Sequence, residues 1–366
     1  MKKGMICNSL LIGIAMFILV ACGTGDPGGL AGGGIGGTGI SVGKITAFGS
    51  VFVNGVKFET TGATITIDGQ TAMNGQDDLE IGMIVAVEGT FNVDGVRGTA
   101  KSINFKDNLE GPVTGVDTTA QTLMVLGQTV IVDATTDIYD ANRNKITLND
   151  IIVGNSVEVS GFTEAAGAIH ATYIKLKADE EREIEIKGTI SNLNDTFHTF
   201  NIGTLIVDYS DALANGQIEV TGGLQDGLFV EVKSTAGVDK SGMLIASKIE
   251  AEDEIFKISG GDEGEKVEIE GIVTGPLSDN QFEVNGQPVQ ITTATHFEGN
   301  TSQADIILGA RLEVEGTVDA NGVIVAKEIS IESEDDSGEG DSDDSPDDGS
   351  DNNDDLPDDE SDGSGS

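Results

Sequence analysis

The chain has 366 residues, of which 51 are Gly, 13 Phe, 3 Tyr and none Trp, and its formal net charge is −43. A Gly-rich chain that is poor in aromatics is typical of many short strands joined by tight turns. So negative a chain repels phosphate backbones and anionic lipid head groups, because affinity for both comes mainly from Lys and Arg. The composition therefore argues against nucleic acid as a partner.

The N-terminal residues predict export. A basic pair, Lys2-Lys3, precedes an apolar run, Leu10–Val20, which has signal-peptide length and is too short to span a bilayer comfortably. The run leads into Leu19-Val20-Ala21-Cys22, which resembles the lipobox of bacterial lipoproteins. We therefore predict cleavage before Cys22 and lipidation of Cys22, so that the N-terminal lipid ties the protein to a membrane. The alternative is an ordinary secretory signal in which Cys22 has no role.

The two cysteines are not both present in the predicted mature protein. Cys7 lies in the segment that cleavage would remove, so the mature protein has no disulfide and each domain depends on its hydrophobic core.

The residue after Cys22 is Gly23, whereas an Asp there would favour retention in the inner membrane. We expect a location in the bacterial cell envelope, on the outer membrane, facing the periplasm or the surface.

A Gly-rich stretch follows, from Gly23 to Val42, with Gly28-Gly29, Gly32-Gly33-Gly34 and Gly36-Gly37. Chains of this kind behave as flexible coils, so we predict a tether that lifts the folded domains off the membrane. A phosphate-binding loop is excluded because no strand precedes the glycines and no helix follows them.

A pattern recurs four times along the rest of the chain. In each copy an apolar residue is followed three positions later by Gly, then by two alternating apolar residues and a small closing residue. The copies read Leu79, Gly82, Val85, Val87 and Gly89; Ile151, Gly154, Val157, Val159 and Gly161; Leu224, Gly227, Val230, Val232 and Ser234; and Ile306, Gly309, Leu312, Val314 and Gly316. A fixed internal period predicts tandem structural units.

The first copy shows what each unit contains. Its strand-like segments are Lys44–Val53, Val56–Thr60, Thr64–Ile67, Ile84–Thr90 and Arg97–Phe105. Asn54-Gly55 is a strong hairpin signal between the first two segments. A polar segment between the third and fourth has room for at most a turn or two of helix. Five strands with this single interruption predict a small Greek-key barrel of the OB type.

The other copies repeat this plan, so the predicted fold class is all-β, with four tandem OB-like Greek-key β-barrels. The last two boundaries, Ala178 to Glu183 and Asp253 to Glu265, are charged or Gly-containing linkers and suggest flexible joints there. The predicted organisation is a lipoprotein signal peptide at 1–21, a disordered Gly-rich tether at 22–42, OB-like repeats at 43–107, 111–177, 184–252 and 266–332, and a disordered acidic tail at 333–366.

These segments resemble a known family. The matching residues are Gly36-Gly37-Thr38-Gly39-Ile40, the run Ile45–Val56, the opening Gly111-Pro112-Val113-Thr114 and the run Val125–Val130. They are similar to the bacterial domain-of-unknown-function 5666 family, with copy three the loosest match because it lacks the closing Gly. The resemblance implies tandem OB-like β-domains in exported, often lipid-anchored envelope proteins. It supplies no catalytic residue.

The tail from Ser333 to Ser366 holds sixteen Asp or Glu and no Lys or Arg. Such a composition buries too little apolar surface to fold, so we predict disorder. Clustered carboxylates are also hard oxygen ligands, which makes weak Ca²⁺ binding an alternative to a purely solvating tail. The EF-hand spacing fails, because Pro346 stands where one frame needs an oxygen ligand. The candidate ligands are Asp341, Asp343, Asp344, Asp347, Asp348 and Asp351.

Catalytic constellations are missing from the sequence. The three histidines, His170, His198 and His296, lie in different copies and at different places within the repeat, which favours structural or surface roles. There is no His-x-x-x-His metal pair. We expect no enzymatic activity, no catalytic residue and no cofactor other than Ca²⁺ in the tail. Four phenylalanines of the first copy are expected in its core: Phe48, Phe52, Phe58 and Phe91.

Two functions of different classes remain. The first is a non-enzymatic envelope module, an array of OB-like domains that binds a protein, a glycan or a small ligand, or acts as a scaffold. The second is a structural surface protein whose acidic body and tail respond to divalent cations. Hydrolysis of an envelope polymer is a third, less favoured alternative.

Overall fold

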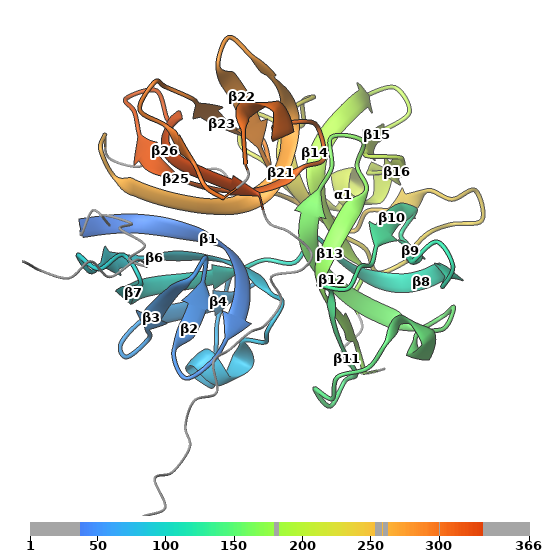
Figure 1. Cartoon of the computed structure of the whole chain (residues 1–366). Coiled ribbons are helices and arrows are strands. Elements are labelled where there is room, and N and C mark those ends of the chain that lie inside the picture. The colour runs from blue at the N-terminus through green and yellow to red at the C-terminus, as the bar shows by residue number, and fades with distance from the viewer. Residues whose placement is uncertain (1–36, 179–182, 253–257, 259–262, 300, 332–366) are drawn as a thin grey trace, which may run out of the picture.

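The computed structural model describes residues 37–178, 183–252, 258, 263–299 and 301–331. The strands and short helices of the four repeats follow one another along the chain (Figure 1). Repeat 1 contains β1 (Gly37–Ala47), β2 (Val51–Val53), β3 (Val56–Glu59), β4 (Thr64–Ile67), β5 (Gln70–Thr71), η1 (Gly75–Asp78), β6 (Ile84–Phe91) and β7 (Arg97–Phe105). Repeat 2 contains β8 (Leu109–Asp117), β9 (Thr122–Val125), β10 (Gln128–Ile131), β11 (Asp137–Tyr139), η2 (Leu148–Asp150), β12 (Ser156–Thr163) and β13 (Ile169–Leu176).

The second half of the chain repeats this order. Repeat 3 contains β14 (Glu185–Asn194), β15 (Thr199–Ile202), β16 (Leu205–Asp208), α1 (Ser210–Asn215), β17 (Ile218–Glu219), β18 (Phe229–Lys233), β19 (Leu244–Ile245) and β20 (Lys248–Ala251). Repeat 4 contains β21 (Lys266–Ser278), β22 (Gln281–Val284), β23 (Gln287–Gln290), β24 (His296–Phe297), η4 (Gln303–Asp305), β25 (Arg311–Val318) and β26 (Ile324–Ile331). Among the described residues α1 is the only α-helix, and no helix there is long and apolar enough to cross a membrane.

Each repeat closes into a five-stranded barrel of the OB type, as predicted. In repeat 1, β1 pairs with β2 and β6, β2 pairs with β3, β3 pairs in parallel with β7, and β7 pairs with β6. Repeats 2 and 4 close through the same circuit of pairings. In repeat 3 the last strand is divided into β19, which pairs with β16, and β20, which pairs with β18. The chain is therefore all-β, built from four small barrels.

The strand assignment within repeat 1 needs one correction. The segment Lys44–Val53 is not a single strand, because a turn at residues 48–50, in which Gly49 takes a φ of 122°, folds β2 back onto β1. Asn54-Gly55 therefore joins the second and third strands of the barrel. The third strand consists of β3 and β4 in succession, since both pair in parallel with β7.

The predicted tether at 22–42 was wrong for its last six residues. β1 begins at Gly37, and the side chains of Ser41 and Val42 are buried. The physical reason is a second pairing: β1 lies between β6 of its own barrel and β21 of repeat 4, which it joins in parallel. Residues 22–36 lie outside the described part of the chain. β8 likewise begins at Leu109, two residues before the predicted start of repeat 2.

The structure explains the first glycine of the recurring pattern. Gly82, Gly154, Gly227 and Gly309 all have φ between 83° and 97°, a left-handed backbone that favours Gly. The N–H of each donates a hydrogen bond, of 2.9 to 3.0 Å, to a carbonyl in the first strand of its own barrel. This contact fixes the start of the fourth strand against the first in every repeat.

The closing small residue of the pattern has a different cause. Gly89, Gly161 and Gly316 stand beside β-bulges in the last strand of their barrels. A Cβ on any of them would lie 2.2 to 2.4 Å from a carbonyl oxygen of that strand. In repeat 3 the β18–β20 ladder has no bulge and ends at Lys233, so Ser234 fits in the same position.

We therefore expect Gly89→Ala to destabilise the protein by about 1–3 kcal/mol, the usual cost of forcing extra atoms into a packed site. A Cβ at Gly89 would meet the Thr99 carbonyl oxygen at 2.3 Å. The control is Gly115→Ala in β8, where the nearest atoms belong to the flexible Met124 side chain at 3.4 Å. Chemical denaturation measures the free energy of unfolding of both variants. Equal free energies of unfolding for the two variants would contradict this explanation of the repeat.

The four barrels are joined by shared sheets, contrary to the expectation of flexible joints. β1 pairs in parallel with β21, and β8 pairs with β14, so repeats 1 and 4 and repeats 2 and 3 form two 13-stranded sheets. Figure 1 shows repeat 1 (blue) next to repeat 4 (orange), with repeats 2 and 3 (green to yellow) beside them. The hydrophobic cores also cross the boundaries, because Tyr173 of repeat 2 belongs to the core of repeat 1. The repeats thus have fixed neighbours.

Candidate functional site

A group of buried charges lies where repeats 1 and 3 meet. We call this group the Lys187 cluster; it consists of Asp68, Asp107, Glu185 and Lys187. The Lys187 Nζ lies 2.7 Å from Glu185 Oε1 and 3.2 Å from Asp68 Oδ1, and it also contacts Asp107 Oδ1. The side chains of Asp107, Glu185 and Lys187 are at most 5% exposed, so these interactions are screened little by water.

The electrostatics of the Lys187 cluster follow from burial. Burial raises the pKa of Asp107 well above its usual range, despite the opposing effect of Lys187. Burial alone would lower the pKa of Lys187, but the carboxylates of Asp107, Asp68 and Glu185 raise it well above its ordinary value. The three carboxylates lie within 4.8 Å of one another, a spacing that could suit a metal ion. Because the ammonium of Lys187 occupies their centre, the cluster acts as a clamp between repeats.

A second buried ion pair lies where repeat 4 meets repeat 1. Lys266 Nζ lies 2.7 Å from Glu268 Oε1 and 3.8 Å from Glu315 Oε1, and 4.3 Å from the centre of the Phe91 ring of repeat 1. Burial raises the pKa of Glu268 from 4.5 to about 7; Lys266 opposes this shift and Glu315 adds to it. The Glu268 carboxyl is thus protonated more readily in the folded protein than in the unfolded chain.

This shift predicts a pH dependence of stability. Between pH 4.5 and 7 the folded state binds more protons at Glu268 than the unfolded state, so this carboxyl lowers stability as the pH rises through that window. We expect Glu268→Gln to gain about 1–3 kcal/mol relative to the parent between pH 4.5 and 7.5. Denaturation across this range measures the gain, with the exposed Glu219→Gln as control. A difference between parent and E268Q that does not change with pH would contradict the assignment.

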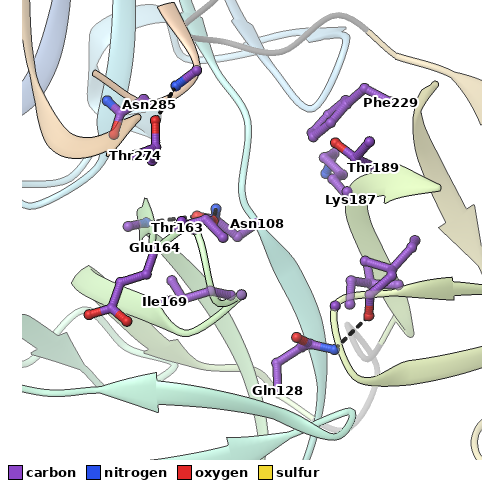
Figure 2. Close-up of a pocket in the computed structure, with 18 of the residues that line it drawn as sticks. Asn108, Gln128, Thr163, Glu164, Ile169, Lys187, Thr189, Phe229, Thr274 and Asn285 are labelled. Atoms are coloured by element: carbon purple, nitrogen blue, oxygen red, sulfur yellow. Dashed lines mark hydrogen bonds between the residues drawn. The ribbon is translucent and has the colours of Figure 1, made fainter. Parts of the chain in front are cut away.

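The cavity that best fits a ligand lies at the junction of repeats 2, 3 and 4, and Ile84, Lys106 and Asp107 of repeat 1 also line it. We call it the central cavity; its volume is about 580 Å³. Figure 2 shows Phe229 and Thr189 of repeat 3 on one side of it, Thr274 and Asn285 of repeat 4 across from them, and Gln128 of repeat 2 at another edge. Ligand sites in proteins typically have volumes of 300 to 1,000 Å³, so the central cavity has the size of a small-molecule site.

Strand alternation explains why these side chains face the central cavity. In β18, Val230 and Val232 are fully buried in the barrel core, so Phe229 projects from the opposite face. Thr189 of β14 lies directly across the ladder from Phe229 and shares that face. In β22 the buried Phe282 and Val284 likewise leave Glu283 on the outer face. The walls of the cavity are thus the outer faces of barrels.

The floor of the central cavity is held by hydrogen bonds between repeats and loops. Asn108 Nδ2 donates to Thr163 Oγ1 at 3.3 Å, and Asn108 Oδ1 accepts from the Gly161 N–H at 2.7 Å. Gln128 Nε2 donates to the Ile202 carbonyl of repeat 3 at 3.1 Å. These bonds fix the amide side chains while leaving Gln128 Oε1 and one N–H of Asn108 to interact with a ligand.

A larger cavity of about 860 Å³ lies at the junction of repeats 1, 2 and 4. Its charged lining holds the repeats together. Lys44 Nζ donates to the Thr135 carbonyl at 2.6 Å and lies 3.3 Å from Asp137, while Arg311 pairs with Glu270. Because these cations are engaged by protein groups, a ligand here would compete with contacts between repeats.

The histidines stay apart, each in its own repeat. His170 Nε2 lies 2.6 Å from Glu164 Oε1, His198 packs with its ring centre 5.6 Å from that of Tyr209, and His296 is exposed in β24. In the described part of the chain, none of the three adjoins another His.

The expectation for the phenylalanines holds for two of the four. Phe58 and Phe91 are buried and stack edge-on with ring centres 5.4 Å apart. Phe48 was wrongly placed in the core: it is 38% exposed, because it begins the turn between β1 and β2. Phe52 is only half-buried, since Val51 and Val53 occupy the inward positions of β2.

Two groups of predicted site residues fall outside the described part of the chain. They are the lipidation site Cys22 and the candidate Ca²⁺ ligands of the tail, Asp341, Asp343, Asp344, Asp347, Asp348 and Asp351. Sequence reasoning missed the Lys187 cluster and Phe229. The sequence pattern that could have indicated the Lys187 cluster is charged residues within a strand, as in Glu185-Ile186-Lys187, where an acidic and a basic side chain flank a buried apolar residue.

Comparison with known proteins agrees with the repeat structure. The model of the family described as "Domain of unknown function (DUF5666)" matches residues 42–104, 110–175 and 270–330. The chain therefore belongs to the DUF5666 family. Repeat 3, which lacks both the closing Gly and its bulge, is the copy that the DUF5666 model leaves unmatched.

Membership of the DUF5666 family names no activity. No curated protein matches the chain. Among solved structures, the Drosophila protein described as "drosophila Unr CSD456" is similar over 62% of this chain and 97% of its own, at 15% sequence identity and a TM-score of 0.17. At that score and identity the match implies nothing about ligand or partner.

Proposed function

We propose that this DUF5666 protein is a non-enzymatic binding module of the bacterial cell envelope, anchored through a lipid on Cys22, with its ligand in the central cavity. The observation that carries the proposal is a cavity of about 580 Å³ whose lining residues come from all four repeats in a fixed arrangement. A site built on shared sheets is preorganised, which reduces the entropic cost of binding. The acidic body leaves the lipid as the main tie to the membrane, in keeping with the net charge of −43.

A binding role accounts for the chemistry of the described residues better than catalysis does. The buried charges of the Lys187 cluster are engaged with one another between repeats. The central cavity contains Thr, Asn and Gln side chains and no Ser-His or Cys-His pair among its lining residues. Nucleophilic catalysis needs such a pair or an equivalent activated group.

The test is thermal unfolding of the full-length chain in detergent against envelope glycans, small metabolites and divalent cations. A ligand that binds only the native state stabilises it by about 2.7 kcal/mol at a hundred times its dissociation constant. We expect a glycan or a metabolite to raise the midpoint. A shift with Ca²⁺ alone would contradict the proposal and favour a cation-responsive protein. Release of Cys22→Ala into the soluble fraction would support the lipid anchor, and its retention in membranes would contradict it.

A further inference from the structure

The chemistry of the central cavity also restricts the kind of ligand. We infer that the cavity is a carbohydrate site, which takes a neutral, hydroxyl-rich oligosaccharide whose ring stacks on Phe229 and whose hydroxyls bond to Thr189 and Glu283. This inference rests on the proposed function, because it names the ligand class of the same site.

The first argument is charge. The two lysines in the lining, Lys106 and Lys187, are both held by protein carboxylates: Lys106 Nζ lies 3.0 Å from Glu252, and Lys187 is enclosed in its cluster. An anionic ligand would therefore meet no cation that is not already paired, and it would enter a strongly acidic protein. Phosphorylated or carboxylated ligands are disfavoured.

The second argument concerns cationic ligands. Three carboxylates, Asp107, Glu164 and Glu283, lie in the lining, and Asp107 is enclosed in the Lys187 cluster. Glu164 is engaged by His170 at 2.6 Å, and Figure 2 shows its carboxylate directed away from Phe229 and Thr189. This leaves Glu283 as the acidic group of the wall formed by repeat 4. A single exposed carboxylate is a weak site for an amine in water, but it is a good acceptor for sugar hydroxyls.

The third argument is the presence of an aromatic surface beside groups that both donate and accept hydrogen bonds. Phe229 is half-buried and stands on the outer face of β18, outside the residues that form the apolar core of repeats 2 and 3. Its neighbour across the ladder, Thr189, offers a hydroxyl, while Gln128 and Asn108 offer amide groups with remaining capacity. A sugar has apolar C–H faces and hydroxyls that donate and accept, so it matches both features.

The experiment is isothermal titration calorimetry of the full-length protein in detergent with four probes. Two are neutral trisaccharides, N,N′,N″-triacetylchitotriose and maltotriose; the third is cationic, spermidine; the fourth is anionic, glucose 6-phosphate. We expect at least one trisaccharide to bind and Phe229→Ala to weaken it at least about tenfold, as expected for loss of a central aromatic contact. Thr189→Val, which keeps the shape of the side chain, should weaken binding by a smaller factor and guards against misfolding of F229A.

The matched control is Phe197→Ala, which removes a 73% exposed phenylalanine of the same repeat that does not line the cavity. It should leave the dissociation constant unchanged. Binding of spermidine or glucose 6-phosphate without either sugar would overturn the carbohydrate inference and leave the proposed binding function standing. A sugar affinity that neither F229A nor T189V alters would also overturn it. If no probe binds and the thermal panel gives no shift, both the inference and the proposed function fail.

Discussion

We expect Lys187→Met to lose about 3–5 kcal/mol of stability at pH 7 to 8, the cost of leaving buried charges without their partner. In the folded protein the side chain of Lys187 is 3% exposed, and its ammonium is enclosed by Asp68 and Asp107 of repeat 1 and by Glu185 of its own repeat. Methionine has a similar length but no charge. Without the ammonium, three carboxyl groups within 4.8 Å repel one another in a site that water scarcely reaches.

The pH dependence of Lys187→Met distinguishes charge from packing. Lys187 holds the pKa of Glu185 down and opposes the rise in the pKa of Asp107, so without the cation both carboxyls bind protons more readily and the variant folds with more bound protons than the parent. The deficit should therefore be smallest near pH 4 to 5 and grow as the pH rises. Denaturation at pH 5 and pH 8 measures the free energy of unfolding of the parent and of Lys187→Met, with Lys240→Met at an exposed position as control. Adding Asp107→Asn to the Lys187→Met chain should recover part of the loss at pH 8. A deficit that is the same at both pH values would point to lost packing alone.

The second large effect is expected from Tyr173→Ala, at about 3–5 kcal/mol, the usual range for truncating a buried aromatic. Tyr173 is on β13 of repeat 2, is fully buried and belongs to the core of repeat 1. Its ring lies 6.2 Å from that of Phe105 in an edge-on arrangement, and 5.9 Å from that of Tyr139. Truncation leaves a cavity between the two barrels, so repeat 1 should lose its attachment to repeat 2.

Hydrogen exchange separates this local effect from general destabilisation. We expect the amides of β7, which contains Phe105, to exchange faster in Tyr173→Ala. Tyr209→Ala truncates a buried tyrosine that stacks on Phe200 within repeat 3, and should destabilise the protein without changing β7. Tyr173→Phe keeps the ring and should retain most of the stability. Equal protection of β7 in Tyr173→Ala and Tyr209→Ala would rule out Tyr173 as the tie between repeats 1 and 2.

Much of the fold could be predicted because it depends on local signals. The Asn54-Gly55 turn, with φ of 49° and 71°, sets a hairpin that few other sequences favour. The four glycines at the start of the fourth strand need a left-handed backbone, which makes them visible as a period in the sequence. The split of the first predicted strand was missed, because Lys44–Val53 is apolar enough throughout to resemble one strand and only the turn at Gly49 divides it.

The candidate site could not be predicted in the same way. Phe229 lies in an ordinary alternating strand, and its role depends on repeat 4 approaching the outer face of β18, some fifty residues away along the chain. Lys187 has the same sequence environment as a surface lysine, and only the arrival of Asp68 and Asp107 from repeat 1 makes it a buried clamp.

The sequence by itself determined the class of each unit, its number of strands, most of its turns and the number of repeats, because these depend on side-chain alternation, glycine backbone geometry and turn residues within about seventy positions. Only the tertiary structure decided that β1 pairs with β21, that β8 pairs with β14, and that residues of all four repeats line the central cavity. Strand edges carry the same backbone donors and acceptors whatever their sequence, so the choice of partner depends on how whole barrels fit together.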